Sequence, residues 1–344
     1  MMLFIFCSLC ILAIFCFYFK RSYYQGPKSD HFTGKIFYNP WQVRPNSFFS
    51  FLKWKWDSRP KEWPAYVHVS SFETPRVQVT TADVFITFIG HSTVLIQTEG
   101  MNILTDPVWS EKIGPYEWLG IKRVCDPGIP FASLPKIDLV LVSHNHYDHL
   151  DLKTLKKLWD RDCPMILTPL GNDAVIHQKH PEIQVKTLDW GECRSFNDQI
   201  SLYLEPVQHW SARGIFDRDK ALWGAFVIQT PNGNIYFPGD SGYCKEIFRK
   251  TKEKFGPFRL AFLPIGAYEP RWFMCYGHMD PEESVQAFKD LGEPLTIGIH
   301  YGTFQLSDEG YLDPVAALQH AKEKFHVPET QFRLLAMGEI SKVC

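Results

Sequence analysis

The stretch LVLVSHNHYDHLDLKTL, residues 139–155, joins a buried strand to a helix through a turn crowded with titratable side chains. Leu139–Val142 is apolar and partly β-branched, which is typical of a strand buried on both faces. Leucines at helical spacing begin at Leu152, and Asp151 is placed to cap the start of that helix. The turn between the two elements carries the pattern H-x-H-x-D-H, which consists of His144, His146, Asp148 and His149.

This setting predicts a metal site, because ligands in open α/β sheets bind at the carboxyl ends of strands. Neutral imidazole and carboxylate are ligands that zinc takes. One histidine in a loop is more often structural, but three further polar residues share the same setting. His209 follows an alternating strand, Asp240 follows the apolar run Ile235–Phe237 on a Pro-Gly turn, and His300 ends another apolar run. The seven side chains are enough for two metal ions with positions left open for water and substrate.

The order of these residues along the chain resembles that of the metallo-β-lactamase superfamily of binuclear hydrolases. Two flanking segments, TFIGHSTVLIQTEGMNILTDPVWS (residues 87–110) and LPIGAYEPRWFMCYGHMDPEESVQAF (residues 263–288), are similar to its N-acylphosphatidylethanolamine-hydrolysing phospholipase D branch. The resemblance runs from about Phe37 to the C-terminus. It implies an α/β fold, the metallo-β-lactamase αββα sandwich with the metal site at one edge, and it allows a homodimer.

The resemblance also implies roles for individual residues. His278 would contact the substrate phosphate or assist proton transfer, and its alternative is a structural histidine that supports a metal ligand or a turn. Tyr147 is a candidate substrate contact in an acyl channel, although aromatic loop residues more often serve packing. His91 and Asp106 match motif positions and are expected to orient ligands. The implied ligand set is one zinc ion on His144, His146 and His209, a second on Asp148, His149 and His300, and Asp240 as the bridging, catalytic carboxylate.

Composition narrows the class of protein. The chain has 344 residues, 45% of them hydrophobic, which is ample for a core. Its formal net charge of −2 argues against nucleic acid as a partner, because nucleic-acid binding needs a basic face. Nine cysteines at scattered spacings do not form a disulfide framework and indicate a reducing compartment.

The first nineteen residues, MMLFIFCSLCILAIFCFYF, contain no charge, and Lys20 and Arg21 follow at once. This length is near the lower limit for spanning a bilayer. A cleaved signal peptide would carry positive charge before the apolar run and a small-residue cleavage site after it, and this segment has neither. We therefore expect a transmembrane anchor at residues 1–19, and the basic residues behind it predict a catalytic domain that faces the cytoplasm.

Residues 20–80 form a lead-in that is rich in proline and aromatic residues, with lysines and arginines interleaved. Its aromatic side chains either form an interfacial patch, since Trp and Lys suit the headgroup zone of a membrane, or pack against the main domain. Strands and helices alternate through residues 81–344, which we expect to form the hydrolase domain.

The leading hypothesis is a membrane-anchored binuclear zinc phosphodiesterase of the phospholipase D type. The resemblance implies that it hydrolyses a membrane phospholipid, N-acylphosphatidylethanolamine, to an N-acylethanolamine and phosphatidic acid. A second hypothesis keeps the metal site and changes the substrate to a lactone or a soluble phosphodiester. A third is a catalytically silent membrane scaffold, which the complete ligand set disfavours because buried titratable groups are costly to retain without metal.

Overall fold

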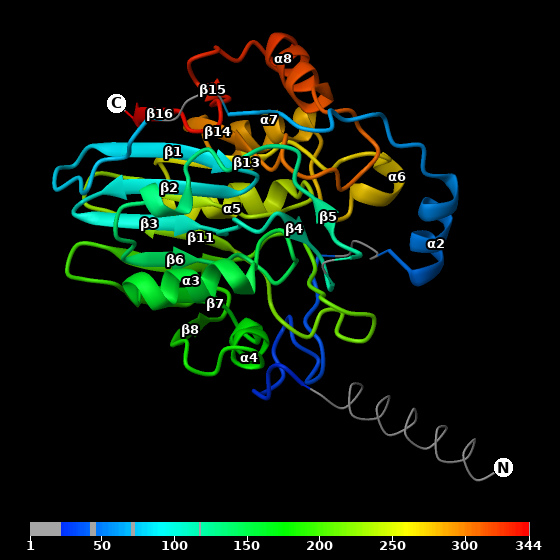
Figure 1. Cartoon of the computed structure of the whole chain (residues 1–344), viewed down its shortest axis with the longest axis horizontal. Coiled ribbons are helices and arrows are strands. Elements are labelled where there is room, and N and C mark those ends of the chain that lie inside the picture. The colour runs from blue at the N-terminus through cyan, green and yellow to red at the C-terminus, as the bar shows by residue number, and fades with distance from the viewer. Residues whose placement is uncertain (1–21, 42–45, 70–72, 117, 344) are drawn as a thin grey trace.

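The computed structural model describes residues 22–41, 46–69, 73–116 and 118–343. Two mixed seven-stranded sheets face each other and carry helices on their outer sides, so the predicted αββα sandwich is confirmed (Figure 1). The first sheet has the order β16-β1-β2-β3-β6-β7-β8. Its strands are β1 Val84–Gly90, β2 Thr93–Thr98, β3 Met101–Thr105, β6 Leu139–Leu141, β7 Met165–Pro169, β8 Val185–Leu188 and β16 Ile340–Val343.

The second sheet has the order β15-β14-β13-β12-β11-β10-β9, and its strands β12 to β15 pair in parallel. Its strands are β9 Cys193–Ser195, β10 Ser201–Glu205, β11 Ala225–Gln229, β12 Asn234–Phe237, β13 Phe258–Pro264, β14 Leu295–Ile299 and β15 Phe332–Arg333. A separate hairpin is formed by β4 Lys112–Ile113 and β5 Ile121–Lys122. The helices are α2 Phe48–Asp57, α3 Leu152–Asp162, α4 Asn172–His177, α5 Lys245–Phe255, α6 Arg271–Met274, α7 Pro281–Asp290 and α8 Asp313–Phe325.

The strand β6 shows why the opening stretch is apolar at every position. Leu139 and Leu141 belong to the large core between the sheets, whereas Val140 and Val142 belong to a second core beneath α3 and α4. Successive side chains of a strand point to opposite faces, so a strand covered on both faces has no polar position. Helix α3 begins as predicted, with the Asp151 carboxylate accepting from the Lys153 backbone N–H at 3.1 Å.

The lead-in divides its aromatic residues between the two expected roles. Phe32 and Phe37 are buried in the main core, and Trp54 on α2 is only 7% exposed. Phe49 and Trp56, on the same helix, are 80% and 84% exposed. The lead-in therefore packs against the hydrolase fold with one set of aromatic residues and presents another set to the surface.

The expected transmembrane anchor at residues 1–19 lies outside the described residues. The longest described helix is α8, whose 13 residues span about 20 Å at 1.5 Å per residue, against a hydrocarbon core of about 30 Å. Within the described ranges no helix is long and apolar enough to cross a membrane. The prediction of a single-pass anchor with a cytoplasm-facing catalytic domain is therefore wrong.

Candidate metal centre

The H-x-H-x-D-H turn is held in place by a carboxylate from the neighbouring strand. Asp106 follows β3 and accepts from the Ser143 backbone N–H and the Ser143 hydroxyl, both at 2.7 Å. The same carboxylate lies 2.7 Å from Nδ1 of His149, which leaves Nε2 of that ring to face the site. A buried partner of this kind fixes the orientation and tautomer of a metal-binding histidine. The expectation that Asp106 orients a ligand agrees with this geometry.

The second sheet brings His209, Asp240 and His300 to the same edge, from the segments that follow β10, β12 and β14. Close approach of the two sheets depends on Gly239, directly before Asp240. Its φ is 62°, and a Cβ there would lie 2.2 Å from the Ser143 hydroxyl. Only glycine fits this position without displacing the turn that carries the first four candidate ligands.

The first group of candidate ligands contains His144, His146, His209 and Asp240, whose ligand atoms all lie within 4.8 Å of one another. Nδ1 of His146 is 2.8 Å from Nε2 of His144 and 3.2 Å from Nε2 of His209. Nδ1 of His209 faces the Gly277 carbonyl at 2.8 Å, so its Nε2 is the atom left for a metal. The structure thus brings together the set that was expected to hold one zinc ion.

The second group contains Asp148, His149 and His300, with His91 beside them. Oδ2 of Asp148 is 3.4 Å from Nε2 of both His149 and His300. His91 lies 2.9 Å from the same Asp148 oxygen through its Nε2, and its backbone carbonyl accepts from the His300 N–H at 2.8 Å. His91 is therefore placed to orient one ligand through its ring and another through its backbone.

Asp240 lies between the two groups. Its Oδ2 is 3.1 Å from Nε2 of His149, 3.1 Å from Nε2 of His300 and 3.8 Å from Nε2 of His209. Nδ1 of His278 is also 3.8 Å from this oxygen. Ligands of both groups are therefore within reach of the Asp240 carboxylate.

Several of these facing atoms have no hydrogen-bond partner, although they are buried. The atoms without a partner among the described residues include Nε2 of His149 and of His300 and both carboxylate oxygens of Asp240. Buried polar groups are normally hydrogen-bonded, so buried atoms that converge without partners indicate a binding site for a ligand or ion. Imidazole nitrogens and carboxylate oxygens are the donors that zinc takes, so the residues fit a metal centre.

Electrostatics separate the candidate ligands into two kinds. Burial, reinforced by neighbouring histidines, holds the pKa of His144 well below its usual value, and burial lowers the pKa of His146 and of His209 to about 3. Burial would also lower the pKa of His300, but Asp240 and Asp148 raise it to about 9. The histidines of the first group are therefore neutral, the form that binds a cation, whereas the carboxylates of Asp240 and Asp148 stabilise positive charge at His300, which is where a cation would be stabilised in its place.

Backbone conformation marks the same residues. His91, Asp106 and His300 adopt left-handed φ angles of 57°, 31° and 64°. Residues other than glycine adopt this region at a cost in free energy, and such strain clusters at functional sites.

Two further side chains at the site were not singled out from the sequence. Ser143 links the turn to Asp106, and the indole of Trp210 lies edge-on to His146 with ring centroids 4.3 Å apart. Their only signal in the sequence is that each is adjacent to a candidate ligand.

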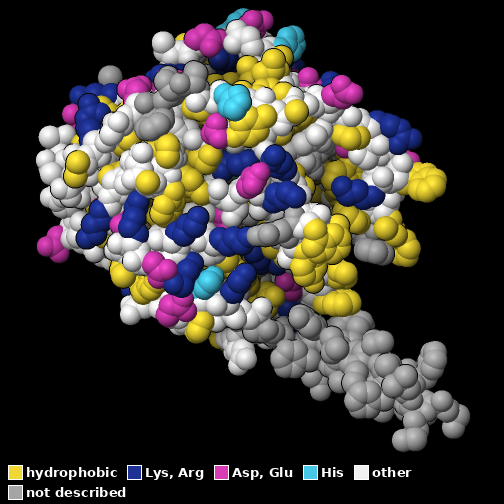
Figure 2. Space-filling model, viewed as in Figure 1, with side chains coloured by type: hydrophobic (Ala, Val, Ile, Leu, Met, Phe, Trp, Pro, Cys, Tyr) yellow, Lys and Arg dark blue, Asp and Glu magenta, His cyan; other side chains and the backbone are white. Residues whose placement is uncertain are grey.

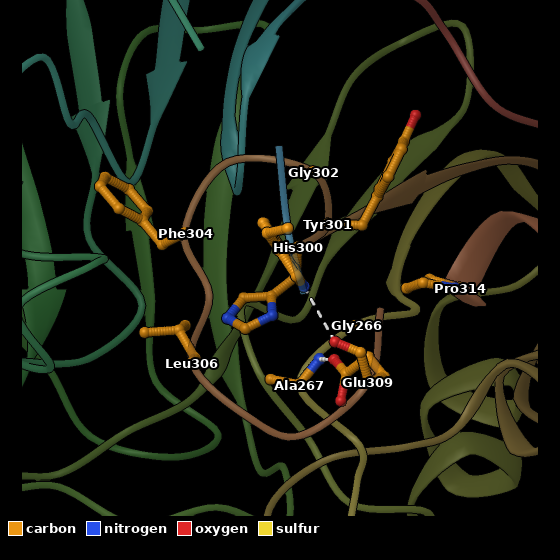
Figure 3. Close-up of a pocket in the computed structure, with 10 residues that line it drawn as sticks. Gly266, Ala267, His300, Tyr301, Gly302, Phe304, Leu306, Glu309 and Pro314 are labelled. Atoms are coloured by element: carbon orange, nitrogen blue, oxygen red, sulfur yellow. Dashed lines mark hydrogen bonds between the residues drawn. The ribbon is translucent and has the colours of Figure 1, made fainter. Parts of the chain in front are cut away.

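The segment behind His300 is supported by the lead-in. A cavity of about 10 Å³ lies beside His300 and is lined by Phe304 and Glu309, which Figure 3 labels, and by Trp63. The Trp63 indole N–H donates to the Glu309 carbonyl at 2.9 Å. The Glu309 carboxylate in turn accepts from the Ala267 backbone N–H at 2.6 Å. The lead-in is thus part of the structure around the site.

Comparisons with known proteins agree with this geometry. The β-lactamase superfamily domain matches residues 101–301. A Caenorhabditis elegans protein named N-acyl-phosphatidylethanolamine-hydrolyzing phospholipase D 1 is 36% identical over 332 residues, which cover 90% of this chain and 92% of that protein. A mitochondrial phospholipase D of the same name from Saccharomyces cerevisiae is 36% identical over 246 residues, which cover 70% of this chain and 52% of that protein.

Solved structures share the fold at lower identity. A metallo hydrolase from the archaeon Ignicoccus hospitalis superposes with a TM-score of 0.57 at 23% identity, over 76% of this chain and 98% of that chain. An isothiocyanate hydrolase from Delia radicum gut bacteria superposes with a TM-score of 0.59 at 21% identity. The superposition covers 75% of this chain and 98% of that chain. The sandwich, the clustered ligands and the matched relatives show that this chain belongs to the β-lactamase superfamily, in the branch of N-acylphosphatidylethanolamine-hydrolysing phospholipases D, and is a metal-dependent hydrolase.

Proposed function

We propose that the protein is a binuclear zinc phosphodiesterase that hydrolyses N-acylphosphatidylethanolamine to an N-acylethanolamine and phosphatidic acid. The observation that carries the proposal is the position of Asp240. Its Oδ2 lies 3.1 Å from His149 and His300 of one group, while the residue also belongs to the group of His144, His146 and His209. The relatives from C. elegans and S. cerevisiae, which carry this substrate in their names, support the choice of lipid.

The candidate ligands fall into two sets, one for each metal ion. His144, His146 and His209 would hold one ion, Asp148, His149 and His300 the other, with Asp240 between them. Zinc bound there would supply Lewis acidity and a hydroxide nucleophile near neutral pH. Asp106 holds the ring of His149 in place, at 2.7 Å from its Nδ1. His91 holds the carboxylate of Asp148 in place, at 2.9 Å from its Oδ2.

His278 is the residue that we assign to the substrate phosphate. Its Nδ1 is 3.8 Å from Asp240, its side chain is 14% exposed, and that nitrogen has no hydrogen-bond partner among the described residues. Burial lowers the pKa of His278 to about 3, so its ring is neutral and can donate from one nitrogen and accept at the other. It is therefore placed to hold a proton near a phosphate oxygen.

Tyr147 enters the proposal as part of the wall of the substrate site. Its hydroxyl donates to the Arg213 carbonyl at 2.8 Å, and the Arg213 guanidinium lies 3.9 Å from its ring centroid. Its ring edge is what we expect an acyl chain to contact.

A rim of exposed apolar residues favours a lipid over a soluble substrate. Figure 2 shows hydrophobic side chains gathered over α2 and the β4–β5 hairpin. Helix α2 contacts α6, the helix that precedes His278, through the Trp54 and Phe273 rings, whose centroids are 4.8 Å apart. The exposed rim residues are Phe49, Phe51, Leu52 and Trp56 on α2, Tyr116, Trp118 and Leu119 in the hairpin, and Trp272 on α6.

Basic side chains are interleaved with this rim. Nζ of Lys53 lies 5.1 Å from the centroid of a Trp272 ring, and Nζ of Lys55 lies 4.1 Å from that of Trp54. Aromatic residues beside lysines suit the headgroup zone of a phospholipid surface. We propose that the rim meets the lipid surface from which the substrate is drawn.

The test is a side-by-side assay of purified protein with measured zinc content. It should be offered N-acylphosphatidylethanolamine, plain phosphatidylethanolamine, a soluble phosphodiester and a lactone in ¹⁸O-labelled water. We expect fastest turnover of the N-acylated lipid, with the label in phosphatidic acid because water attacks phosphorus. Activity confined to the lactone, or label in the N-acylethanolamine, would contradict the proposal, and no turnover of any substrate would favour the scaffold.

A further inference from the structure

We propose that Arg213 is a positioning residue that locks the H-x-H-x-D-H turn into its metal-binding shape. Nη1 of Arg213 donates to the Asn145 carbonyl at 2.9 Å and to the Leu150 carbonyl at 2.8 Å. Asn145 stands between His144 and His146, and Leu150 directly follows His149. One nitrogen therefore joins the two ends of the turn that supplies four of the seven candidate ligands.

The contact is reciprocal. The Tyr147 hydroxyl, at the tip of the turn, donates to the Arg213 carbonyl at 2.8 Å, while the guanidinium lies 3.9 Å from the centre of the Tyr147 ring. The turn and the segment of Arg213 thus hold each other through three hydrogen bonds and one cation–π contact. Hydrogen bonds from a charged donor are about twice as strong as neutral ones.

The segment that carries Arg213 is itself preorganised. The Asp217 carboxylate accepts from the backbone N–H of Arg213 at 3.1 Å and of Gly214 at 2.7 Å. The Tyr23 hydroxyl, from the start of the described lead-in, donates to the same carboxylate at 2.9 Å. The Asp217 carboxylate therefore fixes the backbone at Arg213, and its hydrogen bond from Tyr23 connects this segment to the lead-in.

This arrangement matters because the turn lies outside regular secondary structure. Carbonyls of such a turn have no ladder partner and need a donor from elsewhere. Without that donor, the Asn145 and Leu150 peptides would be free to rotate, and the imidazoles on either side would lose their common direction. Changes to groups that orient metal ligands typically lower metal affinity by about 10–100-fold.

The experiment compares Arg213→Ala and Arg213→Lys with Arg161→Ala as the matched control. Arg161 also donates to backbone carbonyls, of Phe131 at 3.1 Å, Leu134 at 3.4 Å and Pro135 at 2.9 Å. Its guanidinium lies 5.0 Å from the centroid of the Phe131 ring, at the far end of α3 from the turn. The first readout is the rate at which zinc passes from the protein to a chelator, with no substrate present. Melting temperature and the separate values of kcat and KM are the other readouts.

We expect zinc to leave Arg213→Ala about 10–100-fold faster than the wild type, with a lower kcat and a KM that changes little. Arg213→Lys should recover part of the loss, because an ammonium can still donate to one carbonyl. Arg161→Ala should lower the melting temperature without changing zinc release. Wild-type zinc release in Arg213→Ala, or equal acceleration in Arg161→Ala, would overturn the proposal.

Should Arg213→Ala fail to fold, Arg213→Lys and Tyr147→Phe carry the test. Tyr147→Phe removes only the hydroxyl bond to the Arg213 carbonyl, and we expect faster zinc release. Wild-type release in both variants would overturn the inference. The inference rests on the proposed metal site but not on the proposed lipid, because zinc release is measured without substrate. Failure of the lipid assay with normal zinc content would therefore contradict the proposed function alone.

Discussion

The floor of the site, formed by the seven candidate ligands, buries charged and polar side chains, whereas its rim exposes apolar ones. Both are the reverse of what is usual in a globular protein. At the floor, Asp240 is 2% exposed and lies among buried histidines. At the rim, Phe49 and Trp56 are 80% and 84% exposed, although they are large and apolar. Burying charged groups and exposing apolar area both cost free energy unless a ligand compensates.

This contrast indicates which kind of ligand each region is suited to bind. The floor offers nitrogen and oxygen atoms that a metal cation would satisfy, and the rim offers apolar area that a lipid would cover. In our proposal the two regions handle the two ends of one substrate, the phosphate and the hydrocarbon. Substitutions at the floor and at the rim should therefore have separable effects.

Asp240→Asn should disrupt metal binding at the floor of the site. It keeps the size of the side chain but removes the charge that offsets repulsion between two cations, so metal content should fall towards one ion per chain or below. Turnover should fall by more than about 10²-fold, since even loss of an outer partner of a ligand costs about 10–100-fold. His209→Ala, which removes a ligand of one group only, is the comparison. An Asp240→Asn protein with two zinc ions and near-normal turnover would refute the shared role.

His278→Ala should weaken the chemistry and leave the floor intact. We expect two metal ions per chain and a kcat reduced by about 10²–10⁴-fold, the range for a group that handles a proton. His177→Ala is a suitable control, because that histidine sits on α4 and its Nε2 faces the Ile183 carbonyl at 2.9 Å. Loss of one metal ion from His278→Ala would instead identify His278 as a ligand.

Phe49→Ser combined with Trp56→Ser should affect the rim alone. Covering each side chain with lipid is worth about 1.5–3 kcal/mol, so vesicle binding should weaken by at least about tenfold. Turnover of a soluble phosphodiester should stay at its wild-type value. Val77→Ser is the control, because Val77 is 85% exposed and its carbonyl accepts from Asn102 near the start of β3, the end opposite Asp106. Equal losses of vesicle binding in both proteins would remove the rim from the proposal.

His31→Gln should have the smallest effect, on the attachment of the lead-in, which carries the α2 part of the rim. Burial would lower the pKa of His31, but the carboxylates of Asp189 and Asp30, at 2.7 Å and 2.6 Å, raise it above the usual 6.5. The stabilisation is therefore full below pH 6.5 and is lost as pH rises through the pKa of the folded state. The wild type should exceed His31→Gln in melting temperature by about 2–4 °C or less at pH 5.5, and by less at pH 8.5. A difference that grows with pH would show the opposite linkage.

Local sequence accounts for a large part of the fold and of the floor. The strand, turn and helix of residues 139–155 could be predicted because side-chain periodicity and an N-cap carboxylate act over a few neighbouring residues. The superfamily could be identified because metal chemistry restricts the residue types and places them directly after strands. Apolar composition alone was a misleading basis for the predicted membrane anchor, because a count of hydrophobic residues carries no information about the length of a helix.

Contacts between distant segments were decided only by the tertiary structure. Arg213 meets Asn145 across 68 residues and Leu150 across 63, and nothing in their local sequence signals the pairing. Trp54 and Trp56 stand two positions apart on one helix, yet one is buried against α6 and the other is exposed. The chemistry of the site follows from the sequence, because ligand types and strand-end positions are local properties. Only the packing of the two sheets and the lead-in decided where that chemistry converges, because burial depends on which surfaces meet.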